Sequence, residues 1–239
     1  MKLDILVLAA HPDDAELTCG GTILAHVAQG KTVGIVDLTQ GELGTRGTVE
    51  IRRQEAEVAS DILGLRVREN LRLPDGFFQN NREHQLAVVG AIRRFRPEIV
   101  LASAVADRHP DHGRAASLIT DACFLAGLRR VETPGEDGTF QSPWRPRCVY
   151  HFIQDRYLTP DLVVDVSIHW EKKLAAIRAY KSQFYDPESA EPLTYIASEG
   201  FMDAISARGM EMGHHIGVKY GEGFTKEKHL GVKSLFDLI

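Results

Sequence analysis

Residues 3–9 form a short apolar segment that ends in an imidazole and two adjacent carboxylates, His11, Asp13 and Asp14. A nearly continuous hydrophobic run of this length is typical of a strand buried on both faces of a parallel sheet. Pro12 disfavours helical backbone at the histidine, so a turn begins there. The side chains of adjacent aspartates should diverge, so one can bind a cation while the other faces a substrate. Because ligands of open α/β sheets bind beyond the carboxyl ends of the strands, this first loop is a candidate site.

The rest of the N-terminal half alternates strand and helix patterns, which predicts parallel strands joined by right-handed crossovers. Strands are expected at residues 3–9, 32–39, 67–73 and 98–103, and helices at 49–63, 86–95 and 113–125. A Gly/Pro/acid-rich stretch at 129–143 lacks periodicity and is expected to be a mobile excursion, either a lid or a subunit contact. Beyond it, the pattern predicts strands at 147–154 and 162–166, helices at 168–183 and 198–212, and an edge strand at 216–224.

These patterns predict an α/β fold with one Rossmann-like domain, residues 1–239, in which helices flank a mostly parallel sheet. Residues 1–127 are expected to form the core that carries the candidate site. Residues 128–239 are expected to add a C-terminal strand and helix extension to the same domain.

Composition narrows the class of protein. The net charge of −5 gives no electrostatic reason to expect nucleic-acid binding. Three widely spaced cysteines, Cys19, Cys123 and Cys148, suit reduced thiols better than a disulfide framework. The N-terminus has no signal-peptide pattern, and no apolar stretch reaches membrane-spanning length. We therefore expect a cytoplasmic protein with neither nucleic acid nor membrane as a partner.

A second loop repeats the chemistry of the first. The expected strand at 98–103 leads into the run His109-Pro110-Asp111-His112. Parallel strands near the centre of one sheet would bring both loops to the same edge. Two imidazoles, one carboxylate and an open position for water make up a catalytic zinc site, although iron(II) accepts similar ligands. A lone His-Pro-Asp is usually an ordinary turn, but two of them after buried strands favour a metal site.

Two other interpretations are less favoured: a dinucleotide site at the first turn, and a second metal site at His214 and His215. A dinucleotide site needs closely spaced glycines in the first turn, whereas this turn holds carboxylates and Gly20-Gly21 comes too late. His214 and His215 look like a metal pair, but adjacent residues on a helix point apart.

The two histidine loops resemble those of the PIG-L/LmbE-type zinc-dependent deacetylases, which remove N-acetyl groups from glucosamine conjugates. Further blocks resemble the bacillithiol-pathway branch of that family, and together they extend the resemblance over most of residues 3–224. These blocks are residues 41–47, Arg52 with Glu55, and residues 73–76, 153–157, 179–184 and 216–222.

The resemblance implies that three side chains ligate zinc: His11, Asp14 and His112. Asp13 would be the general base that takes a proton from the attacking water. His109 would stabilise the oxyanion or protonate the leaving amine, with Asp111 orienting it. Amide hydrolysis needs an activated nucleophile, a stabilised oxyanion and an acid for the amine, so these roles agree with the chemistry.

The resemblance also implies a small N-acetylated aminosugar as substrate and a homo-oligomeric assembly. For the bacillithiol branch, the substrate is N-acetylglucosaminyl malate. Arg46 would then contact the malate, or else be a solvated loop residue. Arg52 would pair with a site carboxylate or contact the sugar, and Tyr195 would donate to the tetrahedral intermediate. Alternatives are a deacetylase of a chitobiose or mycothiol-type conjugate, or a metal-dependent sugar-binding protein, which would have little use for Asp13.

Overall fold

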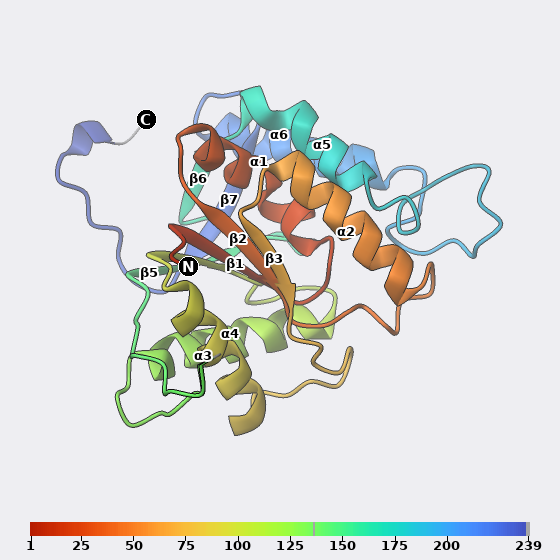
Figure 1. Cartoon of the computed structure of the whole chain (residues 1–239). Coiled ribbons are helices and arrows are strands. Elements are labelled where there is room, and N and C mark those ends of the chain that lie inside the picture. Colours follow the sequence, from red (N-terminus) through yellow and green to blue (C-terminus); the bar gives the residue numbers. More distant parts are fainter. Residues whose placement is uncertain (136, 238–239) are drawn as a thin grey trace.

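The structure, a computed structural model, describes residues 1–135 and 137–237. Within these ranges, seven strands form one sheet in the order β3-β2-β1-β4-β5-β7-β6 (Figure 1). The first five in that order are parallel, and β7 runs antiparallel to both neighbours. The strands are β1 (Ile5–Ala9), β2 (Val33–Asp37), β3 (Val67–Asn70), β4 (Ile99–Ala102), β5 (Cys148–Phe152), β6 (Leu162–Asp165) and β7 (Gly221–Lys226). The predicted Rossmann-like α/β fold is confirmed.

Helices cover both faces of the sheet (Figure 1). One face carries α3 (Arg82–Phe95) and α4 (Pro110–Ala126), and the other carries α1 (Asp14–Ala28), α2 (Val49–Leu63), α5 (Trp170–Arg178) and α6 (Phe201–His215). Every residue of β1 is buried because its side chains alternate between these layers. Leu6 and Leu8 join the cluster around α3 and α4, whereas Ile5 and Val7 join the cluster around α1.

The C-terminal part differs from expectation in one helix end and one strand. The helix expected at 168–183 is α5, which ends at Arg178. The chain at 216–224 is not an edge strand: β7 begins at Gly221 and lies between β5 and β6. The residues before it form the tight turn after α6, where a Cβ on Gly213 would lie 2.8 Å from the carbonyl oxygen of Val218. A Cβ on Gly221 would lie 2.9 Å from the backbone nitrogen of Gly213 in α6, so the glycine is what allows β7 and α6 to approach so closely.

The excursion at 129–143 is attached to α3. Arg93 donates to the carbonyl oxygen of Val131 and, over 2.9 Å, to the hydroxyl of Thr133. Pro134 and Phe140 pair across an antiparallel bridge, and residue 136 lies outside the described residues. The excursion is therefore held against α3 and not over the first and second loops.

Cys19, Cys123 and Cys148 are unpaired in the structure. Burial raises the pKa of Cys123 to about 12, which makes its thiol unreactive. In the described ranges, no helix has both the length and the apolar character needed to cross a membrane.

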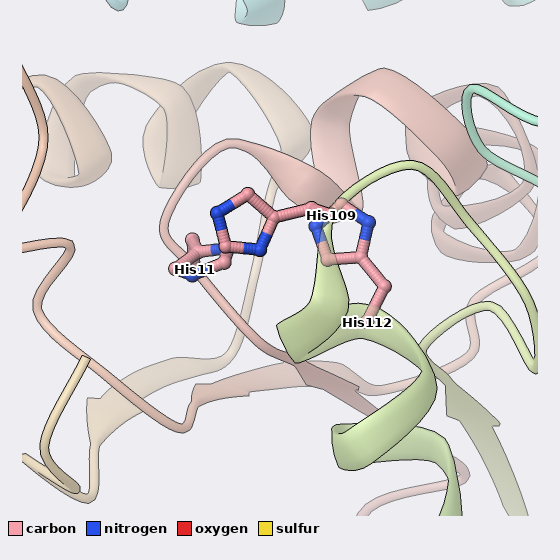
Figure 2. A group of neighbouring side chains, drawn as sticks. All are labelled: His11, His109 and His112. Carbon is pink, nitrogen blue, oxygen red and sulfur yellow. The ribbon is translucent and has the colours of Figure 1, made fainter. Parts of the chain in front are cut away.

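The site is positioned by the pairing of β1 with β4 at the centre of the sheet. The two strands are parallel neighbours, with Leu8 opposite Ala102. Each ends at the same edge, so the loops that follow them meet there, as the sequence predicted. Figure 2 shows His11 from the first loop facing His109 and His112 from the start of α4.

Candidate metal centre

The first loop turns sharply into α1. Asp13 adopts a φ of 111°, in the left-handed region that residues with a side chain rarely occupy. It precedes the helix but forms no capping hydrogen bond with its side chain, so its carboxylate is left for the pocket. Asp14, the first helical residue, instead accepts the backbone N–H of His11 over 2.9 Å. Backbone strain of this kind concentrates at functional sites.

The second loop is ordered by the start of α4. Pro110 occupies the first turn, where its missing N–H costs nothing. Nδ1 of His109 accepts the backbone N–H of Asp111 over 3.3 Å and so caps the helix. His112 follows one turn later and is buried.

Three imidazoles converge at this edge. One ring nitrogen from each of His11, His109 and His112 lies within 4.8 Å of the others. The ring centroids are 4.8 Å apart for His11 and His109, and 5.5 Å apart for His11 and His112. The rings meet largely edge-on, with their nitrogens pointing toward a common space (Figure 2).

Asp14 lies between two of these rings. One of its oxygens is 3.3 Å from Nδ1 of His11, and the other is 3.3 Å from Nε2 of His112. These two nitrogens and one carboxylate form a donor set of the composition that divalent zinc or iron binds. The tautomer of His109 points to a different role, because a Nδ1 that accepts a hydrogen bond leaves the proton on Nε2. Nε2 of His109 is then a donor and not a ligand.

Carboxylates hold the far nitrogen of each of the two rings that contact Asp14. Nε2 of His11 lies 3.0 Å from Asp75 and 3.3 Å from Asp111, and Nδ1 of His112 contacts Asp107. Such partners fix the tautomer and orientation of metal-binding histidines. Neither Asp75 nor Asp107 was assigned a role from the sequence. Available signals were the turn Pro74-Asp75-Gly76 and an aspartate five residues before a candidate ligand.

The position of Asp111 corrects one expectation. Its carboxylate contacts His11, the backbone N–H of Gly76 over 2.8 Å, and Arg114. Its link to His109 is through its backbone N–H alone. Asp111 is fully buried and orients His11, so the expected orientation of His109 by this carboxylate is wrong.

Charges around Asp14 shift the pKa of each partner. Burial alone would raise the pKa of Asp14, but His112 and His11 outweigh it and hold that pKa well below its usual range. Burial would likewise lower the pKa of His112, yet Asp14 and Asp107 raise it to about 9. A cation that binds here must displace protons from these rings. The carboxylates therefore stabilise positive charge at this place, either on the imidazoles or on a bound cation.

Asp13 has the opposite environment. Burial raises its pKa to about 7, and Asp14 adds to the shift, although Arg52 opposes it. Arg52 donates from Nη2 to Asp13 over 3.3 Å and also contacts the amide oxygen of Gln183. Of the two arrangements expected for Arg52, the structure has the ion pair with a site carboxylate. A buried carboxylate with a pKa near 7 is suited to accept a proton at neutral pH.

A pocket of about 1060 Å³ opens above these groups. Its wall includes the loop 43–46, Asp75, Arg108, Gln154, Gln183 and the segment 194–196. The C-terminal part of the chain thus closes a site whose reactive groups come from the N-terminal part. His214 and His215 lie elsewhere, exposed at the end of α6.

All three residues expected to contact substrate line this pocket: Arg46, Arg52 and Tyr195. Asp13, the partner of Arg52, lines it too. Arg46 is buried, and its guanidinium donates to the carbonyl oxygens of Ser182 and Pro192 over 2.8 and 3.1 Å. The alternative of a solvated loop residue is therefore wrong. The hydroxyl of Tyr195 donates to Asp155 over 2.7 Å, and the side chain is half exposed at the pocket mouth.

Comparisons with known proteins agree with this geometry. The sequence profile of the PIG-L family, described as GlcNAc-PI de-N-acetylase, matches residues 6–123, which contain both loops. The diacetylchitobiose deacetylase of Thermococcus kodakarensis is 31% identical to this chain. The alignment covers 92% of this chain and 81% of the deacetylase. The 4-oxalmesaconate hydratase of Pseudomonas putida is 29% identical, covering 74% of this chain and 73% of that protein.

A solved structure extends the likeness over the whole fold. The conserved protein TT1542 from Thermus thermophilus has a TM-score of 0.86 and 38% identity, covering 97% of this chain and 98% of that one. The family profile spans both loops, and the relatives and the solved structure extend the likeness over most of the chain. We conclude that this chain is a member of the PIG-L family of deacetylases.

Proposed function

We propose that the protein is a metal-dependent hydrolase that removes the N-acetyl group of N-acetylglucosaminyl malate. The observation that carries the hydrolase proposal is the placement of Asp13, with its pKa of about 7, in one pocket with the Asp14 cluster. This cluster consists of Asp14, His11 and His112. A sugar-binding site without turnover would have no use for a proton acceptor there. Zinc is the metal we propose, with iron(II) as the alternative, bound by His11, Asp14 and His112.

Each remaining group has a defined task in this reaction. When bound, the metal supplies Lewis acidity for a water molecule and for the amide carbonyl. Asp13 accepts the proton from the attacking water, and its pair with Arg52 keeps the carboxylate aimed into the pocket. The neutral ring of His109 faces the same space and donates a hydrogen bond from Nε2 to the developing oxyanion, while Asp13 would pass the proton it has accepted to the leaving amine. Tyr195 would be a further donor at the mouth once its hydroxyl leaves Asp155.

The malate part of the proposal is supported by Arg108. The donors of Arg46 are engaged by the segment 182–192, and Arg52 is engaged by Asp13 and Gln183. Arg108 also lines the pocket, but it is half exposed, stacks 4.2 Å above the ring of Tyr195 and lies 3.6 Å from Asp155. An exposed guanidinium with such a loose ion pair is well suited to bind a carboxylate. We therefore assign the malate contact to Arg108 in place of Arg46, whose donors are engaged within the protein.

The test is acetate release from N-acetylglucosaminyl malate, diacetylchitobiose and plain N-acetylglucosamine, each with a chelator and with zinc restored. We expect metal-dependent release that favours the malate conjugate. Preference for diacetylchitobiose or for an inositol conjugate would keep the deacetylase and replace the substrate. Saturable sugar binding without acetate release would favour a binding protein. Because the chain is also 29% identical to a hydratase, the control reaction is addition of water to an unsaturated acid. Oligomeric assembly and cytoplasmic location stay predictions from the sequence.

A further inference from the structure

Gln154 belongs to none of the roles assigned so far, yet its side chain is in direct contact with Asp14. It lies two residues beyond the end of β5 and is buried. Its amide Nε2 donates to Oδ1 of Asp14 over 2.6 Å. The same Oδ1 lies 3.3 Å from Nε2 of His112. The amide therefore helps set the orientation of the carboxylate proposed to bind the metal.

The backbone around Gln154 is fixed by the second loop. Oδ1 of Asp107 accepts the backbone N–H groups of Asp155 and Arg156 over 3.0 and 2.7 Å. Its other oxygen contacts His112. One aspartate thus holds the ring of His112 and the peptide segment that presents Gln154, so the two partners of Oδ1 of Asp14 are positioned together.

The other end of the amide has no partner. Oε1 of Gln154 is buried and accepts no hydrogen bond from the described residues. Because Nε2 must face a carboxylate, which only accepts, the amide cannot rotate to exchange its two ends. Gln154 lines the site pocket and also the adjoining cavity of about 600 Å³, so this unpartnered, solvent-shielded oxygen belongs to a residue in the wall of the site. Buried hydrogen-bond acceptors without a partner are uncommon in proteins. At a binding or catalytic site, such an acceptor can be paired by a ligand or by water.

We propose that Gln154 has two functions: it positions Asp14 through its N–H, and it accepts the scissile amide N–H of the substrate through Oε1. The second part rests on the proposed function. An N-acyl aminosugar carries one N–H next to the carbonyl carbon that is attacked, so that N–H must lie near the Asp14 cluster. A neutral acceptor fits there, since a carboxylate would compete with Asp14 for the cation. This contact would select amides over esters.

The first experiment measures metal affinity, independent of turnover. Gln154→Met has similar volume and lacks both polar atoms. We expect it to bind zinc roughly 10- to 100-fold more weakly in competition with a chromophoric chelator. Gln141→Met is the matched control, because Gln141 also has an unpartnered buried Oε1 and donates its N–H to a backbone carbonyl, but lies beside α3. Unchanged zinc affinity in a folded Gln154→Met protein would overturn the positioning role.

The second experiment tests the substrate contact by calorimetry in the Asp13→Asn background at saturating zinc. The probes are N-acetylglucosaminyl malate and its analogue with an ester oxygen in place of the N–H. We expect Gln154→Met to weaken amide binding roughly 3- to 10-fold more than ester binding. Equal weakening of both probes refutes the contact. If neither probe binds before Gln154 is changed, the proposed substrate and the contact fail together, while the zinc measurement still decides the positioning role.

Discussion

The two sides of the first loop form opposite electrostatic environments only one residue apart. On the imidazole side, Asp14 faces His11 and His112, and its pKa falls well below the usual range despite burial. On the guanidinium side, Asp13 faces Arg52, and burial raises its pKa to about 7. The effect of burial on the pKa of Asp13 therefore exceeds that of one arginine at 3.3 Å. For Asp14, two imidazoles together lower the pKa by more than burial raises it. One carboxylate remains charged to hold a cation, and its neighbour can exchange a proton.

The largest expected effect comes from breaking the imidazole side. Asp14→Ala removes the carboxylate that lies between the two rings, so the protein should lose its metal and all metal-dependent acetate release. Metal content after gel filtration, measured by inductively coupled plasma mass spectrometry, checks this. A variant that keeps about one metal ion per chain would contradict the assignment of Asp14 as a ligand and leave His109 as the candidate third ligand.

Changing the guanidinium side should separate catalysis from metal binding. Asp13→Asn keeps the size of the side chain and removes the proton acceptor, so kcat should fall by roughly 10²–10⁴ while the metal stays bound. Steady-state kinetics and metal content on the same sample provide the test. Retained activity would remove Asp13 from the role of base, and concurrent metal loss would show that the two sides are not independent.

The outer carboxylates sharpen the imidazole side further. Asp107→Asn keeps an oxygen for the backbone N–H groups of Asp155 and Arg156 but weakens the contact to His112. We expect metal affinity to fall roughly 10- to 100-fold. Chelator competition measures it, with Asp61→Asn on the exposed surface of α2 as the control. Affinity equal to the control would mean that His112 is oriented without Asp107.

The smallest effect concerns stability of the metal-free protein. Folding raises the pKa of Asp13 from 3.8 to about 7, so the folded chain keeps a proton that the unfolded chain releases. Stability should therefore fall as pH rises from about 4 to about 7. Asp13→Asn removes this loss and should stabilise the metal-free protein by roughly 1–3 kcal/mol at pH 8 and by less at pH 5. Thermal melts at both pH values test it, and an equal gain at both would contradict the assigned pKa.

The sequence predicted the parts of this site that follow buried strands. The His/Asp motifs at 11–14 and 109–112 could be found because each belongs to the loop after an apolar run, and parallel strands end at one edge. The choice of His11, Asp14 and His112 among their side chains as the expected ligands came from the family resemblance. Asp75, Asp107 and Gln154 could not be assigned, because aspartate and glutamine are common in loops and their partners are distant in sequence. The interior place of β7 was missed for a related reason, since a strand rich in glycine has no apolar pattern that reveals its neighbours.

The most direct test of the account is an anomalous difference map at the zinc edge from crystals of the Asp13→Asn protein. We predict one peak, bound by Nδ1 of His11, the carboxylate of Asp14 and Nε2 of His112, with His109 nearby and not coordinated. A peak bound by the three imidazoles, with Asp14 displaced, would contradict the assignment of metal binding to Asp14 and of proton transfer to Asp13.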